Sequence, residues 1–329
     1  MKTILLGLPP EDRADERLAR VRALAPDYRL LVTVDDAEIE AVLDDIEIAA
    51  ARVPRSLTAK GKNLRWMQQW GAGADWLMND AEAVAHPFVL TNASGIHAIP
   101  ISEHIVAMML ALARRLPEVI RRQPTHEWRR PERQQVRELA GSTAVVIGLG
   151  AIGGRTARLL HAHDVHVIGV RRNPAIPADG VARTVGPDEL LTVLPEADWI
   201  VITAPLTPET RHLIGARELA VTKPSACILN IGRGPIIDQD ALIATLREGR
   251  LAGAGLDVTT PEPLPANSPL WDMDDVIITP HYSGSTPAYE DRAFALFEQN
   301  LQRYLAGQPL INVVDKHLAY SPPEVDAEP

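Results

Sequence analysis

Short apolar runs alternate with amphipathic segments along the first third of the chain. Apolar residues cluster at 4–6, 30–32 and 46–48, and patterns of helical period separate them at 15–24 and 37–43. Strands that alternate with helices of this length are typical of a parallel sheet with crossover helices. The pattern therefore predicts an α/β domain at the start of the chain.

The alternation breaks at residues 101–116, where apolar residues occupy nearly every face of a predicted helix. Such a helix is expected to be buried between two layers, and we interpret it as a hinge between domains. A second series of strands and helices follows, and a last helical pattern runs over 287–304. The predicted strands of this second series lie at 143–147, 165–170, 199–202, 227–231 and 276–279.

The length and charge of the chain limit what it can be. Its 329 residues are enough for about two domains. The net charge of −10 argues against a nucleic-acid-binding surface. No export signal is visible, and the most apolar helical stretch, 105–113, is far shorter than the ~20 residues that a bilayer requires. We expect a cytoplasmic protein with no nucleic-acid or membrane partner.

Two residue types attract attention without predicting a site. Cys227, the single cysteine, lies in an apolar run and is interpreted as a buried structural thiol. His161, His163 and His166 are close in sequence but span the end of a predicted helix and the start of the next strand. No metal site is expected from them.

A glycine motif directly follows the predicted strand at 143–147 and opens a helix. Its first glycine permits a tight turn, its second lets a pyrophosphate approach the backbone, and its third lets helix and strand pack closely. The phosphates of a dinucleotide are then expected at the helix N-terminus. The residues assigned to this site are Gly148, Gly150, Ala151, Ile152 and Gly153.

The next predicted strand ends in Arg171 and Arg172, where NAD-binding versions of the motif have an acidic residue that holds the ribose hydroxyls. Two guanidinium groups suit a 2′-phosphate instead, because they donate charge-assisted forked hydrogen bonds. The sequence therefore favours NADP(H), with NAD(H) possible. The alternative is a pair of solvated arginines on a loop.

Three polar side chains follow later strands of the second domain, where ligand crevices of open α/β sheets form. They are Arg233, Glu262 and His281. Arginine can hold a carboxylate at two points and polarise the neighbouring carbonyl, and histidine can exchange the proton of an alcohol near neutral pH. Glutamate can orient the histidine ring and favour its protonated form. Each residue alone is ordinary, but together they suit the reduction of a carbonyl group.

In this order the motifs resemble those of the D-isomer-specific 2-hydroxyacid dehydrogenase family, which includes glyoxylate and hydroxypyruvate reductases. The resemblance covers nearly the whole chain and is strongest over 141–284. It rests on the glycine motif, the Ala-Pro-Leu-Thr-Pro-Glu-Thr run at 204–210, and the blocks that contain Arg233, Glu262 and His281.

The resemblance implies a role for each of these residues. Arg233 would bind the substrate carboxylate and carbonyl, His281 would be the general acid/base, and Glu262 would orient His281. In the first domain, the backbone N–H groups of Ala72 and Gly73 would meet the substrate carboxylate, with a plain turn as the alternative.

The resemblance also extends the cofactor site beyond the glycine motif and the arginine pair. Asp257 would meet the nicotinamide carboxamide. The other residues expected to line the cofactor are Ala204, Pro205, Thr210, Ile231, Gly232 and Gly284.

The architecture and the reaction follow from the same resemblance. A doubly wound cofactor domain at 100–286 would be inserted into a smaller flavodoxin-like substrate domain, formed by 1–99 and 287–329. The reaction would transfer a hydride between NADP(H) and C2 of a small 2-oxo or 2-hydroxy acid of D configuration. Closure about the helices at 101–116 and 287–304 would exclude water, and a homodimer is expected through 101–116 and 128–137.

Two departures and two alternatives stay open. Arg171 stands where many members carry an aspartate, and Tyr282 stands where a small or apolar residue is common. The side chains that could shape the substrate pocket are Trp66, Trp70, Ile96, Trp128 and Tyr282. The alternatives are a nucleotide-sensing scaffold like the corepressors that resemble this family, and a dehydrogenase of the same fold for another small anion, such as phosphite or formate.

Overall fold

The computed structural model describes residues 2–9 and 16–321 and divides into two compact units. The first unit comprises Met1–Ile96 and Thr286–Pro329, and the second comprises His97–Ser285. The second unit is thus inserted into the chain of the first. The expected boundaries, after residues 99 and 286, lie close to these divisions.

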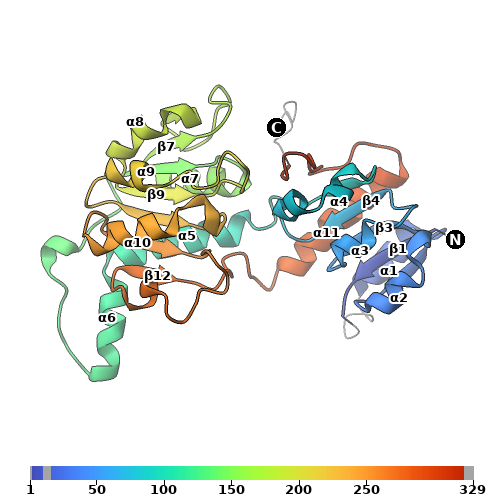
Figure 1. The fold of residues 1–329 in the computed structure, drawn as a ribbon, viewed down its shortest axis with the longest axis horizontal. Helices are drawn as coiled ribbons and strands as arrows, with labels where there is room; N and C mark the ends of the chain where they lie inside the picture. Colours follow the sequence, from blue (N-terminus) through green and yellow to red (C-terminus); the bar gives the residue numbers. More distant parts are fainter. Residues whose placement is uncertain (1, 10–15, 322–329) are drawn as a thin grey trace. The chain divides into compact units, whose positions relative to one another are not determined.

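The first unit is built on a parallel sheet of five strands in the order β2-β1-β3-β4-β5 (Figure 1). This is the strand order of flavodoxin-like folds. The strands are β1 (Thr3–Gly7), β2 (Arg29–Val32), β3 (Ile46–Ala51), β4 (Trp66–Gln69) and β5 (Val89–Thr91).

Helices cover both faces of this sheet, because successive residues of a strand point to opposite sides. Ile4 and Leu6 of β1 face a cluster that includes residues of α1 and α11, whereas Leu5 faces a second cluster with residues of α2 and α4. The helices of this unit are α1 (Glu16–Leu24), α2 (Asp36–Glu40), α3 (Arg55–Thr58), α4 (Ala81–Ala85) and α11 (Tyr289–Leu305).

Helix α11 completes the first core although it lies far along the chain. Phe294 and Phe297 are fully buried, and each such side chain contributes ~1.5–3 kcal/mol by leaving water. Trp66 of β4 stacks on Phe297 with ring centroids 5.3 Å apart. Asn300 of α11 donates from Nδ2 to Oε1 of Gln68 at 2.9 Å. These contacts explain why the chain returns to the first unit after the insertion.

The second unit has a parallel sheet of seven strands in the order β12-β11-β10-β9-β6-β7-β8. The chain begins at β6 and reverses direction across the sheet between β6 and β9, as in a doubly wound Rossmann fold. The predicted fold class is confirmed. The strands are β6 (Thr143–Ile147), β7 (His166–Val170), β8 (Arg183–Val185), β9 (Trp199–Ile202), β10 (Cys227–Asn230), β11 (Gly253–Leu256) and β12 (Val276–Ile278).

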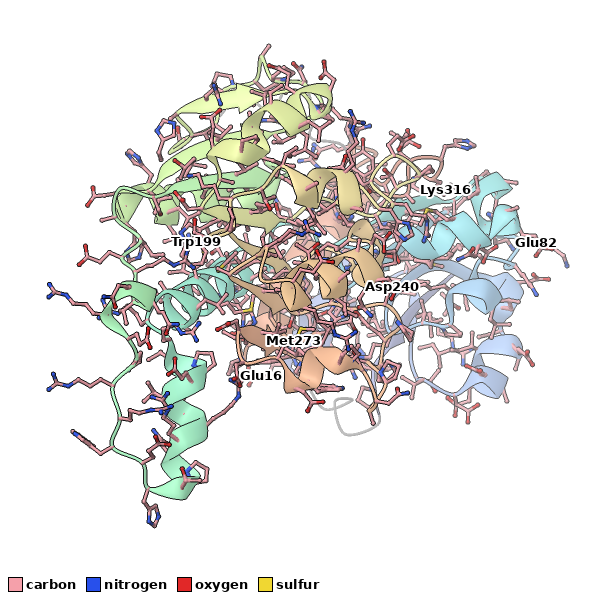
Figure 2. All side chains as sticks on the ribbon, turned by 60° about the vertical axis from the view of Figure 1, so that its left-hand side comes forward. Glu16, Glu82, Trp199, Asp240, Met273 and Lys316 are labelled. Carbon is pink, nitrogen blue, oxygen red and sulfur yellow. The ribbon has the colours of Figure 1, made fainter. Side chains whose placement is uncertain are left out.

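Two hydrophobic clusters hold helices against the two faces of this sheet. Residues of α5 and α7 belong to one cluster, together with Trp199, which is labelled in Figure 2, and Cys227. Burial raises the pKa of the Cys227 thiol, which fits the structural thiol predicted there. The helices are α5 (Ala98–Ala113), α6 (Leu116–Arg122), α7 (Ala151–Ala162), α8 (Leu190–Val193), α9 (Ala216–Ala220) and α10 (Gln239–Arg247).

The predicted helix at 101–116 differs from the structure in length and in burial. Arg115 has a left-handed backbone (φ 57°) that separates α5 from α6. Helix α5 buries one stripe, which includes Ile105 and Met109, whereas Ile99 and Leu110 are 39% and 37% exposed. The prediction that nearly every face of this helix is buried is therefore wrong. Its role as a hinge stays a prediction.

Helix α6 and the segment after it project from the rest of the second unit (Figure 1). They expose apolar side chains, with Leu116 at 44%, Ile120 at 57% and Trp128 at 99%.

Within residues 2–9 and 16–321, no helix is both long enough and apolar enough to span a membrane.

Candidate active site and cofactor site

The predicted cofactor and catalytic residues of the second unit follow strands that end at one edge of its sheet. Because all its strands are parallel, their carboxyl ends share that edge. The glycine motif follows β6, the arginine pair follows β7, and the run 204–210 follows β9. Arg233 follows β10, Glu262 follows β11, and His281 follows β12. The topology thus brings predicted site residues that lie more than a hundred positions apart in the sequence to the same edge of the sheet.

The three glycines of the motif have different surroundings. Gly148 has φ +96°, and a Cβ on Gly153 would lie 1.9 Å from the Gly148 carbonyl oxygen, so both positions exclude a side chain. A Cβ on Gly150 would meet no atom within 4 Å. Protein packing therefore explains the first and third glycines, and the second faces open space at the start of α7. The N–H groups of a first helical turn have no partners inside the helix, so this space fits the pyrophosphate of a dinucleotide.

Thr203, at the end of β9, supports this turn and was missed by the sequence analysis. Its hydroxyl donates to the Gly148 carbonyl at 2.6 Å. The only signal in the sequence is a polar residue at the end of a buried strand. In the run that follows, the Thr210 hydroxyl donates to the Pro205 carbonyl at 2.7 Å and accepts from the Thr207 N–H, also at 2.7 Å. Together with buried Ala204, these bonds give the run a fixed shape beside the glycine motif.

The arginine pair lies where the loops after β7 and β9 approach each other. Arg171 is partly buried and donates from Nη1 to the Ile176 carbonyl at 3.5 Å, whereas Arg172 is exposed. A hydrogen bond from Thr207 lowers the pKa of Glu209, and the charge of Arg172 adds a smaller effect in the same direction. The Arg172 guanidinium is therefore close enough to act on the loop after β9. Binding of a 2′-phosphate by this pair stays a prediction.

His281 and Glu262 form a hydrogen-bonded pair. The distance from His281 Nδ1 to Glu262 Oε2 is 2.8 Å, and Glu262 Oε1 accepts from the Thr259 N–H at 3.1 Å. Since a carboxylate only accepts, Nδ1 carries a proton and Nε2 is the nitrogen that can exchange one. The side chains are 49% and 38% exposed. A solvent-accessible imidazole with a fixed orientation can act as a general acid or base.

The loop that carries Arg233 is held by Asn230. The Asn230 side chain accepts from the Gly232 N–H at 3.0 Å and donates to the Arg233 carbonyl at 2.9 Å. A Cβ on Gly234 would lie 1.9 Å from the Thr259 carbonyl oxygen, so this loop packs directly on the one that leads to Glu262. Asn230 is a second positioning residue that the sequence analysis missed. Ile231 and Gly232, both expected at the cofactor, are buried here.

Asp257, predicted at the nicotinamide, has a carboxylate that is 0% exposed. It accepts hydrogen bonds from the Thr279 hydroxyl at 2.6 Å and from the N–H groups of Tyr282 and Ser283 at 3.1 and 3.2 Å. Its contact with a carboxamide stays a prediction. Gly284 follows this segment, and a Cβ there would lie 2.8 Å from the His97 ring.

In the first unit, the loop at 71–73 follows β4 and turns its carbonyl groups inward. The carbonyl of Gly73 accepts from the Gln69 side chain at 2.7 Å, and that of Ala72 accepts from the Asn92 side chain at 2.8 Å. Within the described parts of the chain, no hydrogen bond engages the N–H groups of Ala72 and Gly73. Two N–H groups presented in this way can bind an anion.

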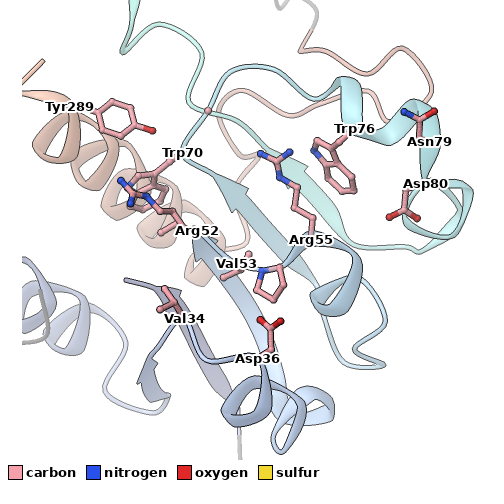
Figure 3. A pocket seen from close by; sticks show the side chains of 13 residues that line it. Val34, Asp36, Arg52, Val53, Arg55, Trp70, Trp76, Asn79, Asp80 and Tyr289 are labelled. Carbon is pink, nitrogen blue, oxygen red and sulfur yellow. The ribbon is translucent and has the colours of Figure 1, made fainter. Parts of the chain in front are cut away.

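A cavity of about 710 Å³ adjoins this loop within the first unit (Figure 3). Arg52 and Arg55 come from the segment after β3, and the Arg55 guanidinium lies over the Trp76 ring at 5.3 Å. Trp70, one of the predicted pocket residues, lines this cavity together with Gly71. The aromatic side chains and guanidinium groups together form a half-polar wall.

Other predicted pocket residues lie elsewhere. Trp66 is 0% exposed and stacks in the core of the first unit, so its assignment to a pocket wall is wrong. Trp128 is 99% exposed on the projecting segment. Ile96 packs against the first core, and Tyr282 is 48% exposed next to His281. Apolar residues of similar type could not be sorted between core and pocket by pattern alone.

Among the described residues, no group of three or more His, Cys, Asp or Glu side chains is arranged to hold a metal ion.

Comparison with known proteins places these features in context. The family model for the D-isomer specific 2-hydroxyacid dehydrogenase NAD binding domain matches residues 106–283. A D-3-phosphoglycerate dehydrogenase of Methanocaldococcus jannaschii is 34% identical over 290 residues, which cover 87% of this chain and 53% of that protein. This chain therefore spans about half the length of that relative. A glyoxylate reductase of Thermofilum pendens is 33% identical over 259 residues, covering 78% of this chain and 76% of that protein.

Solved structures have the same architecture. A D-isomer specific 2-hydroxyacid dehydrogenase of Xanthobacter autotrophicus Py2, in complex with NADPH and MES, superposes with a TM-score of 0.83. The two chains are 30% identical, and the match covers 97% of this chain and 100% of the other.

Proposed function

Because this chain belongs to the D-isomer-specific 2-hydroxyacid dehydrogenase family, we propose that it transfers a hydride between NADP(H) and C2 of a small 2-oxo or 2-hydroxy acid of D configuration. The observation that carries the proposal is the 2.8 Å pair of His281 and Glu262, on the sheet edge that also bears the glycine motif. The second unit is then the cofactor domain, and the first is the substrate domain.

The residues divide the chemistry of carbonyl reduction among them. Arg233 binds the substrate carboxylate and polarises the carbonyl at C2, and the N–H groups of Ala72 and Gly73 are assigned to the same carboxylate. The nicotinamide, when bound, supplies the hydride. His281 gives its Nε2 proton to the oxygen that becomes the alcohol, and Glu262 fixes the orientation of the ring by accepting from Nδ1.

NADP(H) is the proposed cofactor because two arginines, and no carboxylate, follow β7. Arg171 and Arg172 would bind the 2′-phosphate, and Gly150 would let the pyrophosphate approach α7. The structural neighbour crystallised with NADPH supports this choice.

The proposed substrates are acids of the glyoxylate and hydroxypyruvate type, in line with the name of the Thermofilum relative. We assign the cavity beside Gly71 to the group on C3 of the acid, because it adjoins the loop assigned to the carboxylate. Glyoxylate has no such group, so the cavity affects only larger acids.

A homodimer is part of the proposal. The apolar side chains exposed on α6 and the following segment exceed what isolated surface residues of a monomer present. Sedimentation should show twice the mass of the chain, and a single species of monomer mass would contradict this assignment.

Initial rates with glyoxylate, hydroxypyruvate and pyruvate, each with NADPH and with NADH at neutral pH, test the function. We expect turnover of at least one acid, with NADPH favoured. Turnover with NADH alone would overturn the cofactor assignment. No turnover with any acid would overturn the proposed reaction and favour a scaffold or a different small anion.

A further inference from the structure

The loop that carries His281 is tied to the end of the neighbouring strand. In the register of β11 and β12, Leu256 pairs with Ile278, so Asp257 and Thr279 leave the sheet side by side. The Asp257 carboxylate is fully covered and accepts three hydrogen bonds, all from the segment 279–283. A buried carboxylate whose bonds all go to one short segment fixes the path of that segment.

His281 itself has an unfavourable backbone conformation. Its φ of 50° is left-handed, which a residue with a Cβ adopts only where its surroundings fix it. Its N–H group donates to the carbonyl oxygens of Asp257 and Thr279, each at 2.9 Å. Asp257 and Thr279, the residues that directly follow β11 and β12, therefore hold the backbone of His281 in place.

His104 of α5 contacts the same hydrogen-bond network through Thr279. Its Nε2 lies 3.1 Å from the Thr279 hydroxyl oxygen. That hydroxyl has one proton, and it gives this proton to the Asp257 carboxylate at 2.6 Å, since a carboxylate can only accept. The hydroxyl must therefore accept from His104, whose ring carries its proton on Nε2. Burial lowers the pKa of His104, and the Asp257 charge opposes this effect.

His104 also contacts the loop through its ring. The ring is 14% exposed and meets the Tyr282 ring edge-on, with centroids 5.3 Å apart. Helix α5 thus contacts the residues on both sides of His281, one by a hydrogen bond and the other by an aromatic contact.

We propose that Thr279 and His104 are positioning residues for the proposed reaction, on which this inference rests. Through Asp257 they hold the segment 280–283 so that His281 keeps its left-handed backbone and its Nδ1 contact with Glu262. The hydrogen bonds run in one direction, from His104 Nε2 to the Thr279 hydroxyl and from there to the Asp257 carboxylate. Loss of the central hydroxyl removes both bonds and leaves the nearby carboxylate with one donor fewer.

Thr279→Val tests the network, because it keeps the shape of the side chain and removes the hydroxyl. A displaced acid/base group reduces chemistry more than binding, so kcat should fall by roughly 10- to 100-fold, with the KM for NADPH nearly unchanged. Thr279→Ser should restore most of the rate. Thr245→Val is the matched control, because Thr245 is also buried and its hydroxyl donates within α10, to the Ala241 carbonyl at 2.8 Å. It should leave kcat unchanged.

Amide hydrogen exchange of the peptide that contains 279–285 tests the same network without turnover. The Tyr282 and Ser283 amides should exchange faster in Thr279→Val than in the wild type or in Thr279→Ser. His104→Phe, which keeps an aromatic ring against Tyr282, should speed exchange by a smaller factor and serves if Thr279→Val does not fold. Wild-type rates of exchange in both variants, or an equal loss of kcat in the Thr245 control, would overturn the proposal. Faster exchange with an inactive wild type would instead contradict only the proposed function.

Discussion

The carboxyl edges of the two sheets differ in how their functional residues are encoded. At the edge of the second sheet, short motifs follow individual strands, and each motif contains a glycine, an arginine or a histidine to which the proposed function gives a role. At the edge of the first sheet, the cavity combines Arg52 after β3, Trp70 after β4 and Tyr289 at the start of α11. No spacing in the sequence links these three residues.

The comparison shows which parts of a site can be recognised from the sequence alone. A backbone that must turn tightly or approach another backbone requires glycine, as at Gly153, where a Cβ would lie 1.9 Å from a carbonyl oxygen. A pocket wall requires only side chains of suitable size, and many residues satisfy that. The residues proposed for the cofactor and for catalysis at the second edge can therefore be recognised in the sequence, whereas those proposed to select the substrate at the first edge cannot.

Among the effects that distinguish the two edges, the largest concerns the choice of cofactor at the second edge. Replacing both Arg171 and Arg172 with Gln removes the two charged donors proposed for the 2′-phosphate, and because Arg172 is exposed its hydrogen bonds contribute less than those of a buried charged group. The ratio of kcat/KM with NADPH to that with NADH should fall by about 100-fold. Arg217→Gln, at an exposed position on α9, should leave the ratio unchanged. Equal losses with both cofactors would contradict a phosphate site.

A pair of neighbouring glycines tests the packing argument. Gly153→Ala should destabilise the fold by ~1–3 kcal/mol, because its Cβ would meet the Gly148 carbonyl and the Thr203 hydroxyl. Gly154→Ala, where a Cβ meets nothing within 4 Å, should stabilise α7 by ~0.5–1 kcal/mol. Urea unfolding of both variants measures the difference. Similar free energies of unfolding would show that close packing does not explain Gly153.

A smaller effect should distinguish the first edge from the second. Arg52→Gln removes a charge from the cavity wall, but the side chain is 70% exposed, so the loss is modest. We expect kcat/KM with hydroxypyruvate to fall by roughly 3- to 10-fold, with little change for glyoxylate. Arg65→Gln is the matched control, since Arg65 is exposed and precedes β4 at the opposite edge of the sheet. An equal loss for both acids would remove the cavity from substrate selection.

The smallest effect concerns how the free energy of unfolding depends on pH. Burial lowers the pKa of His104 below 6.5 in the folded chain, so the unfolded chain binds a proton that the folded chain does not. The free energy of unfolding should therefore fall as the pH drops through 6.5 toward the folded pKa. The charged group that faces the ring is Asp257, and it opposes this shift. Urea unfolding above and below that pH should show a weaker decline in His104→Phe, and an unchanged decline would contradict a buried neutral ring.

The sequence predicted the framework of the fold well because hydrophobic period determines it. The five strands predicted for the second series lie within a residue of β6, β7, β9, β10 and β12, and the last helix, α11, also follows its predicted range, whereas no range was predicted for β8 or β11. The helix at 101–116 was mispredicted because a single left-handed residue, Arg115, ends one helix and starts another. Apolar composition also could not show that only one face of α5 is buried.

The residues that support the site could not be predicted for a different reason. Asn230 holds the loop that follows its own strand, whereas Thr203 and Thr279 each act through a hydrogen bond to a loop that another strand carries. Their partners are defined by strand order, which becomes known only with the fold. His104 shows the same limit, because a histidine in an apolar helix gives no sign of its contact with Thr279.

The most direct test of the account compares wild-type chain with His281→Ala, using glyoxylate or hydroxypyruvate and saturating NADPH. Loss of the acid/base group should lower kcat by roughly 10²- to 10⁴-fold, while binding of NADPH, measured by fluorescence titration, stays close to that of the wild type. Wild-type turnover in His281→Ala would contradict the assignment of the chemistry to the edge of the second sheet.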